Sequence, residues 1–177
     1  MLVGASLTPA RADGQLCQIE QSVRAKHQQI EHTEPSAIAG RLATPSVEAD
    51  RQVILVDVRE ADEFGVSHLP GALRIDPAAT PEDLLRHIGD VAGREVVLYC
   101  SVGVRSSKLG ARALTALKAA GATRVANLSG GIFRWHNEGR PLAVGTAPSR
   151  DVHPYNFWWG RLVRDQSRIR YSPVPRR

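Results

Sequence analysis

Short apolar runs alternate with amphipathic segments along the middle of this 177-residue chain. Residues 53–58, 95–99 and 124–128 are rich in Val, Leu and other apolar side chains, as is typical of strands buried on both faces of a parallel sheet. Residues 72–75 form a further short candidate strand. Such strands, alternating with helical patterns, predict an α/β fold with a parallel sheet.

Helix signals stand between and beyond these runs. Residues 33–35 and 80–83 each combine a capping hydroxyl with acidic residues and a proline, which is a common start of a helix. Residues 44–46 should break the first of these helices, and Gly121 is placed to end the most regular one. The predicted helices cover residues 18–29, 33–42, 80–88 and 106–120, and a short stretch that runs through Trp135.

Composition limits the classes of protein and of site. Hydrophobic residues make up 42% and charged residues 23% of the chain, as in ordinary globular domains. No apolar run approaches the roughly 20 residues that cross a bilayer. Cys17 and Cys100 are the only cysteines, which excludes a disulfide framework. The six histidines are scattered, without the spacing of zinc ligands, so we expect no metal.

The net charge of +5 belongs to the end of the chain. Residues 150–177 hold seven arginines and two aspartates, and the remaining residues hold 16 basic and 16 acidic side chains. A neutral main body argues against nucleic-acid binding by the domain itself. We divide the chain into an N-terminal extension (1–32), one domain (33–145) and a basic, aromatic C-terminal tail (146–177).

The start of the chain is mildly apolar, and residues 10–12 (Ala-Arg-Ala) are similar to a signal-peptide cleavage site. Because the apolar stretch is short and no basic region precedes it, we interpret this start as an unstructured terminus. The protein is expected in the cytoplasm, with export as the alternative. The sequence does not indicate an oligomeric state.

The chemistry gathers where the strand at 95–99 meets Cys100. A loop with Gly103 follows, and then Arg105 opens a helix. The N-terminus of a helix carries free N–H groups and a partial positive charge, and a tight loop there aims successive amides inward. Such a centre favours the thiolate form of a cysteine, which is the attacking species. The alternative is a cysteine simply buried at a strand end.

Four segments, in this order, resemble the rhodanese family of sulfurtransferases. Residues 100–106 (Cys-Ser-Val-Gly-Val-Arg-Ser) are similar to its active-site loop, and residues 56–64 are similar to its first signature. Residues 68–72 (His-Leu-Pro-Gly-Ala) and 128–142 are similar to two further motifs of the family. The resemblance covers residues 33–142.

The resemblance implies a rhodanese-like α/β fold, a five-stranded parallel sheet with helices on both faces. It also implies that Cys100 takes a sulfane sulfur from a small donor such as thiosulfate, and passes it from a persulfide to a thiol or cyanide acceptor. Arg105 would help bind the anionic donor, and the loop amides would stabilise the sulfur anions. No metal or organic cofactor is expected. The residues expected to contact substrate are Ser101, Val102, Gly103, Val104, Arg105 and Ser106.

The loop departs from the family at two positions. Many members have arginine where this chain has Ser101, and Val104 makes the loop more apolar than in many relatives. One cation fewer argues against strong binding of thiosulfate. A less polar mouth favours a protein or thiol partner over a small dianion.

Several neighbouring residues have structural interpretations. Asp57 and Arg59 are expected to tie a strand end to adjacent loops, His68 to be a hydrogen-bonded turn residue, and Trp135 to lie in the core. Cys17 is expected to be a bystander, since a role as a resolving thiol would need the N-terminal segment to fold over the active site.

Two other functions compete with sulfur transfer catalysed by this chain. In cysteine phosphatases five residues separate the cysteine from the arginine, whereas here there are four, residues 101–104. A shorter loop makes a smaller bowl, which suits one sulfur atom better than a phosphate group. The other alternative is a non-enzymatic persulfide carrier or docking module whose partner does the chemistry.

The C-terminal tail motivates the docking alternative. Tyr155, Phe157, Trp158 and Trp159 lie within five positions, and four arginines follow among residues 161–170. Exposed, they would form a basic, aromatic patch for a protein, a membrane surface or a nucleic acid. We favour the interpretation in which the aromatic side chains fold back and cap the domain.

Overall fold

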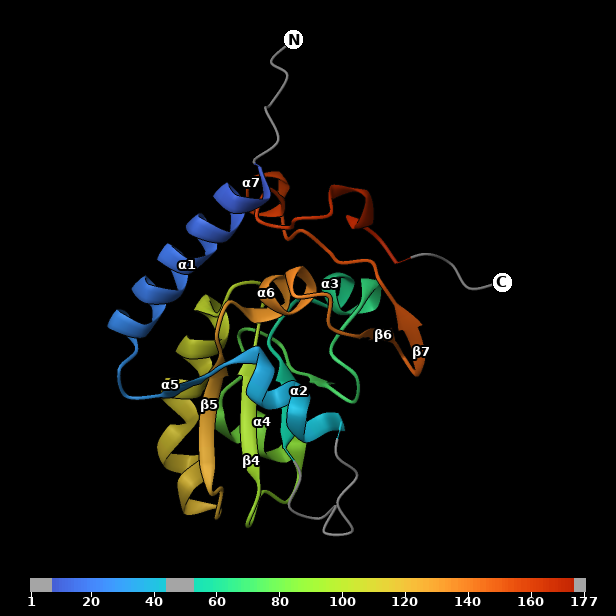
Figure 1. Cartoon of the computed structure of the whole chain (residues 1–177). Helices are drawn as coiled ribbons and strands as arrows, with labels where there is room; N and C mark the ends of the chain where they lie inside the picture. Colours follow the sequence, from blue (N-terminus) through green and yellow to red (C-terminus); the bar gives the residue numbers. More distant parts are fainter. Residues whose placement is uncertain (1–7, 44–52, 174–177) are drawn as a thin grey trace.

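The computed structural model of the chain describes residues 8–43 and 53–173 (Figure 1). Five parallel strands form one sheet in the order β1-β5-β4-β2-β3, and β6 and β7 form a separate antiparallel pair. The strands are β1 (Glu31–Thr33), β2 (Ile54–Asp57), β3 (Leu73–Arg74), β4 (Glu95–Tyr99), β5 (Arg124–Leu128), β6 (Leu142–Val144) and β7 (Ala147–Ser149).

Seven α-helices connect and flank these strands, and a short 3-10 helix (Gln166–Arg168) lies in the tail. The α-helices are α1 (Pro9–Lys26), α2 (Pro35–Ala43), α3 (Ala61–Val66), α4 (Pro81–Ile88), α5 (Val104–Ala119), α6 (Gly131–Asn137) and α7 (Phe157–Gly160).

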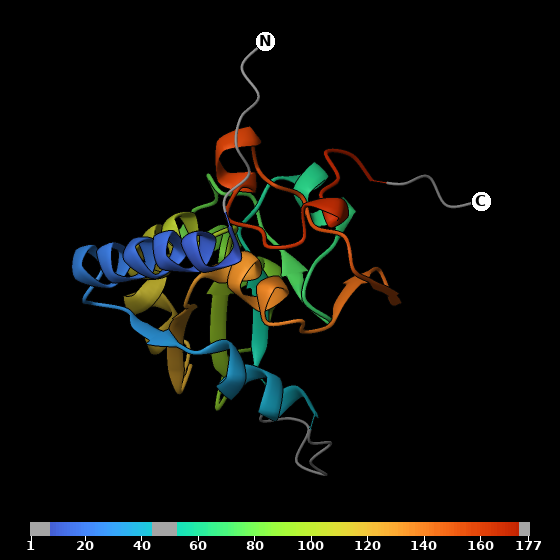
Figure 2. The ribbon, with the colours of Figure 1, turned by 45° about the horizontal axis from the view of Figure 1, so that its top comes forward.

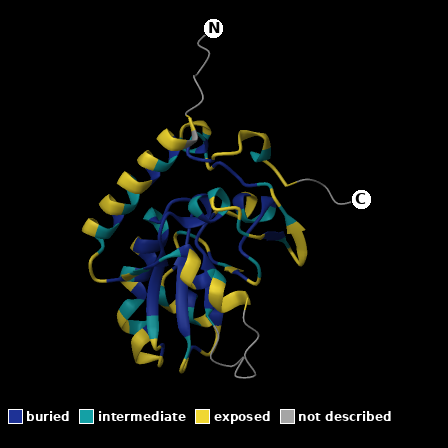
Figure 3. Cartoon of the chain, in the orientation of Figure 1, coloured by how far each residue is buried: buried dark blue, intermediate teal, exposed yellow. Residues whose placement is uncertain are grey.

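The sheet is covered on both faces, and the alternation of side chains along each strand sets the two cores. On β4, Val96 and Leu98 pack with α4 and α5, whereas Val97 and Tyr99 pack on the other face, with residues of α1, α2 and α6. Figure 3 shows the central strands as the most buried part of the chain. The predicted five-stranded parallel sheet with helices on both faces is therefore confirmed.

Local signals position two helices as the sequence predicts. The Thr80 hydroxyl accepts a hydrogen bond from the backbone of Asp83 and caps α4. Helix α5 starts at Val104, slightly before the predicted residue 106, because Gly103 takes a left-handed conformation (φ 99°) and ends the loop early.

The N-terminal helix α1 differs from its prediction, since it covers Pro9–Lys26 rather than residues 18–29. Ala12, Leu16 and Val23 are buried against the domain, but the polar residues between them hide the helical period. Helix α1 lies beside α6 (Figure 2). Its residues are therefore not an unstructured start, while residues 1–7 lie outside the described part of the chain.

The segment after α1 also corrects a prediction. Thr33, expected to begin a helix, instead ends β1, which pairs with β5 at the edge of the sheet. This three-residue strand, Glu-His-Thr, has no apolar run that could announce it. Helix α2 starts at Pro35, and residues 44–46, the expected breaker, lie outside the described residues. Our division of the chain into segments stays a prediction.

The C-terminal tail packs back onto the domain. Val152, Leu162 and Val163 are buried in the same core cluster as residues of α1 and α6. Arg164 pairs with Asp13 of α1 at 2.5 Å, which joins the tail to the N-terminal helix. The tail is therefore part of the folded unit.

The aromatic residues of the tail do little of the capping that the sequence predicts. Trp159 is half-buried and packs against the core cluster, but Phe157 and Trp158 are 58% and 71% exposed. Helix α7 is a single turn and can bury only one side. The aliphatic residues before and after it make the buried contacts instead.

We expect Leu162→Ala to lower the free energy of unfolding by about 2–4 kcal/mol, because it removes a buried side chain from the core. Trp158→Ala, a larger truncation at an exposed position, should change it by less than about 1 kcal/mol. Urea unfolding of the two variants measures both effects. Equal losses would contradict the packing of the tail described above.

Candidate active site

Cys100 is the first residue after β4, the central strand of the sheet, and lies at its carboxyl end. Its side chain is almost fully enclosed, with 1% exposed. The backbone N–H of Gly103 donates a hydrogen bond to the Cys100 sulfur at 3.2 Å. Helix α5 begins at the next residue, Val104, so its partially positive N-terminus lies at the thiol. This arrangement matches the strand–cysteine–loop–helix motif in the sequence.

The shape of the loop depends on glycine at position 103. A Cβ atom there would lie 2.9 Å from Nδ2 of Asn127, a residue of β5, which is the neighbour of β4 in the sheet. Asn127 in turn accepts a hydrogen bond from the Ser106 hydroxyl at 2.6 Å. The Ser106 side chain therefore binds Asn127, and the Val102 side chain is buried in the core cluster. Any contact of these two residues with substrate would use their backbone.

The N-terminus of α6 fixes the loop from the other side. The N–H groups of Ile132 and Phe133 donate to the carbonyl oxygens of Cys100 and Ser101 at 2.9 and 3.1 Å. Gly131 allows this approach, because a Cβ atom there would lie 2.3 Å from the Cys100 carbonyl oxygen. These bonds hold the two carbonyl oxygens of the loop on α6, while the Gly103 N–H contacts the sulfur.

Glu63 of α3 binds two polar side chains of the loop, Arg105 and Ser101. The Arg105 guanidinium donates to both carboxylate oxygens of Glu63, at 2.7 and 2.8 Å, and to the Ser101 hydroxyl at 3.0 Å. That hydroxyl donates to Glu63 at 3.0 Å. Burial alone would raise the pKa of Glu63, but its bonds with Arg105 and the charge of Arg59 lower it, so the carboxylate is charged.

This network changes the expected role of Arg105. Its charge is shared with a buried carboxylate, so the loop amides and the helix N-terminus must add to its attraction for an anion. Glu63 is the site residue that sequence reasoning does not single out, since it lies 42 positions from Arg105. Its only signal is its place in the first of the four family-like segments.

Comparison with known proteins gives the family. The family model of the rhodanese-like domain matches residues 40–138, more than half of the chain. The chain belongs to the rhodanese-like domain family. This match includes the loop at Cys100 together with Glu63 and Gly131.

Relatives of this rhodanese-like chain include proteins named as sulfurtransferases. It is 34% identical to the probable adenylyltransferase/sulfurtransferase MoeZ of Mycobacterium tuberculosis, over 62% of this chain and 26% of MoeZ. It is 36% identical to a sulfurtransferase of Allochromatium vinosum, over 52% of this chain and 79% of that protein. The chain thus spans about a quarter of the length of MoeZ.

A solved structure supports the fold alone. The thiosulfate sulfurtransferase from Pseudomonas aeruginosa matches with a TM-score of 0.54 and 21% identity, over 79% of this chain and 24% of that one. The rhodanese fold predicted from the sequence motifs is confirmed by this match and by the family model.

A buried ion pair supports the carboxyl end of β2 in this rhodanese-like domain. Arg59 donates to the Asp57 carboxylate at 2.7–3.1 Å and to the Ser67 carbonyl oxygen at 2.6 Å.

The end of β4 is bound to the same region through Tyr99. The Leu69 N–H donates to the Tyr99 hydroxyl at 3.0 Å, and burial raises the pKa of Tyr99 well above its usual value. These contacts tie the strand end to adjacent loops, as the sequence leads us to expect.

His68 and Trp135 also lie in structural surroundings. The His68 ring stacks on Phe64 at 3.9 Å, and its Nδ1 lies 3.1 Å from the Phe64 carbonyl oxygen. Trp135 is fully buried and donates from Nε1 to the Pro141 carbonyl oxygen at 2.8 Å. The predicted hydrogen bond of His68 and the core position of Trp135 are therefore confirmed, but His68 forms an isolated β-bridge with Ala143 and precedes the turn. Cys17 is exposed on α1, and its role as a bystander stays a prediction.

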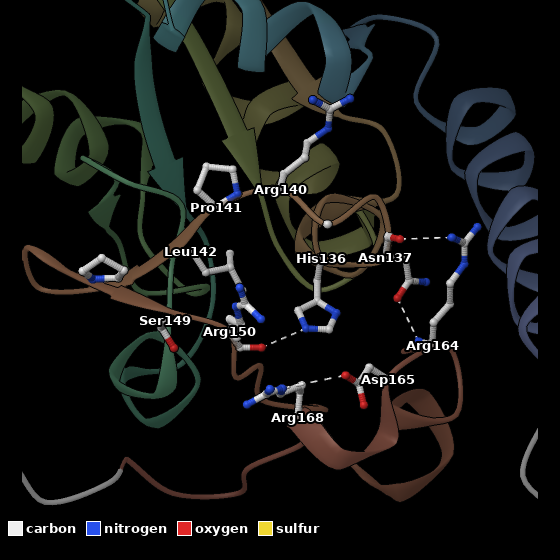
Figure 4. A pocket seen from close by; sticks show the side chains of 12 residues that line it. His136, Asn137, Arg140, Pro141, Leu142, Ser149, Arg150, Arg164, Asp165 and Arg168 are labelled. Atoms are coloured by element: carbon white, nitrogen blue, oxygen red, sulfur yellow. Dashed lines mark hydrogen bonds and ion pairs between the residues drawn. The ribbon is translucent and has the colours of Figure 1, made fainter.

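A cavity of about 790 Å³ lies at the C-terminal end of α6 (Figure 4). His136 donates from Nε2 to the Arg150 carbonyl oxygen at 3.0 Å within it. None of its lining residues belongs to the loop at 100–106. They are His136, Asn137, Gly139, Arg140, Pro141, Leu142, Pro148, Ser149, Arg150, Arg164, Asp165 and Arg168.

Two features are absent from residues 8–43 and 53–173. None of their helices is long and apolar enough to span a membrane. They hold no group of three or more His, Cys, Asp or Glu side chains placed to bind a metal ion.

Proposed function

We propose that this protein transfers sulfane sulfur through a persulfide on Cys100. The observation that carries the proposal is the enclosed thiol at the end of β4, with the Gly103 N–H on its sulfur and the N-terminus of α5 beside it. These groups favour a thiolate and would equally favour the terminal sulfur anion of a persulfide. Membership of the rhodanese-like family supports the same chemistry.

The transfer takes two steps that balance without another reactant. The Cys100 thiolate attacks the outer sulfur of thiosulfate, a new S–S bond forms, and the old S–S bond breaks as sulfite leaves with its electron pair. An acceptor thiolate or cyanide then attacks the outer sulfur of the Cys100 persulfide. The acceptor leaves as a persulfide or as thiocyanate, and the Cys100 thiolate is regenerated.

The loop favours persulfide donors over thiosulfate. Ser101 stands where many relatives have arginine, and the charge of Arg105 is balanced by Glu63. A dianion would therefore meet backbone N–H groups, a helix N-terminus and a single cation whose charge is shared with Glu63. Persulfides carry less charge and lose less from this change. The loop amides of residues 101–106 would hold either donor.

A persulfide carrier that docks to a partner is the second candidate function. It is favoured by Phe157 and Trp158, which stay exposed beside a basic tail, since exposed aromatic groups commonly mark partner sites. A cysteine phosphatase is less favoured because of the short loop and the carboxylate that already occupies Arg105.

Steady-state kinetics test the proposed function. Initial rates measured over both thiosulfate or a small persulfide donor and cyanide or a thiol acceptor should give parallel double-reciprocal lines, the pattern of a ping-pong mechanism. Stoichiometric loading without turnover would favour the carrier instead. Hydrolysis of p-nitrophenyl phosphate without sulfur transfer would overturn the proposal in favour of a phosphatase.

A further inference from the structure

Tyr155 has an unusual backbone conformation. Its φ is 64°, and it is the only residue other than glycine with a positive φ among residues 8–43 and 53–173. Bulky side chains rarely adopt this left-handed region, because the Cβ atom crowds the backbone. Strain of this kind persists only where the surroundings impose it, and it often marks a functional position.

Contacts on both sides impose the turn at Tyr155. Its N–H donates to Nδ1 of His153 at 3.0 Å, and the N–H of Asn156 donates to the Pro154 carbonyl oxygen at 2.8 Å. The Asn156 side chain then caps α7 by accepting from the Trp159 N–H at 3.0 Å. Burial lowers the pKa of His153, which keeps its Nδ1 free to accept.

The turn holds the Tyr155 ring on the active-site loop. The ring lies over the Arg105 guanidinium at 4.7 Å, within the range of a cation–π interaction. Glu63 and Ser101 hold the edge of the same guanidinium. The ring itself is 46% exposed, so burial of apolar surface does not account for its place.

The Arg105 guanidinium binds the hydroxyl of Ser101, the residue next to Cys100. Burial alone would lower the pKa of Arg105, but the hydrogen bonds of Glu63 and the charge of Cys100 raise it. Arg105 is the only cation among residues 100–106. Because an arginine side chain has many rotamers, each contact with its guanidinium helps to hold it in one conformation.

We propose that Tyr155 is a positioning residue for sulfur transfer, which holds the Arg105 guanidinium in place beside Cys100. This rests on the function proposed above. The ring covers one face of the guanidinium, while Glu63 and Ser101 fix its edge. By contrast, the rings of Phe157 and Trp158 pack on each other, with their centroids 5.6 Å apart. Trp158 therefore offers a matched control on the same tail.

The first test compares Tyr155→Gly with Tyr155→Phe and Trp158→Ala in the full chain. Glycine accepts the positive φ, so Tyr155→Gly should leave the midpoint of thermal unfolding unchanged or raise it. The rate of Cys100 persulfide formation from thiosulfate, measured by quenched intact mass, should nevertheless fall about tenfold. The rate of persulfide formation in Tyr155→Phe should stay within about twofold of that in the unmodified chain, because the variant keeps the ring. Trp158→Ala should form the persulfide at the same rate as the unmodified chain. An unchanged rate in Tyr155→Gly would overturn the proposal.

A double-mutant cycle tests whether Tyr155 acts through Arg105. In an Arg105→Lys background, Tyr155→Gly should cause little further loss, because the planar group that the ring holds is gone. An undiminished tenfold effect in that background would show that the ring acts elsewhere and would contradict the proposal.

Alkylation separates this inference from the proposed function. Arg105 should attract iodoacetate more than neutral iodoacetamide, so the ratio of their rates at Cys100 should fall in Tyr155→Gly. The exposed Cys17 is an internal reference whose ratio should not change. If the unmodified chain forms no persulfide but the ratio at Cys100 still falls, the sulfur-transfer proposal fails and the positioning role stands. An unchanged ratio would overturn the positioning role.

Discussion

Gly131→Ala is expected to damage both the fold and the site. The new Cβ atom would lie 2.3 Å from the Cys100 carbonyl oxygen and 2.7 Å from that of Ser101, and glycine here has a φ of 55°. The N-terminus of α6 must therefore move away from the loop. Overpacking and left-handed strain together should lower the free energy of unfolding by about 3–5 kcal/mol. Persulfide formation should fall at least about tenfold, as the loop loses its support.

Gly139→Ala is the matched control, at the other end of α6. Its φ is 70°, but a Cβ atom there would meet nothing within 4 Å. The substitution adds the same kind of backbone strain without the clash, so it should cost about 1–2 kcal/mol and leave sulfur transfer intact. Urea unfolding and single-turnover rates check both variants. Similar losses of activity in the two would contradict the role of α6 at the loop.

Glu63→Gln is expected to have the second largest effect. The carboxylate is buried and accepts two bonds from Arg105 and one from the Ser101 hydroxyl. A neutral amide leaves the guanidinium without its partner, and breaking such a pair should lower the free energy of unfolding by about 2–4 kcal/mol. Glu138→Gln, which weakens the more exposed pairs with Arg134 and Arg140, should cost less than about 1 kcal/mol.

The loss of stability in Glu63→Gln should depend on pH. The pKa of Glu63 is lower in the folded chain than its ordinary value of 4.5, so the folded state releases this proton more readily. The stability from the group is present above pH 4.5 and is lost as pH falls through the lower folded pKa. The difference in free energy of unfolding between the unmodified chain and Glu63→Gln should have its full size at pH 7 and should become smaller below pH 4.5. A difference in free energy of unfolding that grows on acidification would contradict a charged pair of Glu63 with Arg105.

The sequence predicts the parts of the fold that depend on neighbouring residues. The run before Cys100 is apolar enough to be a strand buried on both faces, and Thr80 with Asp83 is a capping pair three positions apart. By contrast, β1 is a polar edge strand whose only support is its pairing with β5. Helix α1 is equally hard to predict, because its apolar residues are few and the reason for their spacing is seen only in their packing against the domain.

The same limit applies to the site. Cys100 and Gly103 belong to one contiguous motif, so the sequence reveals the nucleophile and its loop. The contact of Glu63 with Arg105 joins elements 42 positions apart, and no spacing rule connects them. The ring of Tyr155 reaches Arg105 only because of a left-handed turn in the tail, which the residue type argues against.

The sharpest test of sulfur transfer through Cys100 is the intact mass of the purified chain after incubation with thiosulfate, or with a small persulfide donor. Sulfur transfer through Cys100 predicts a gain of one sulfur atom, reversed by a reducing thiol and absent in Cys100→Ser. The absence of any gain with either donor, or an equal gain in Cys100→Ser, would contradict sulfur transfer through a Cys100 persulfide.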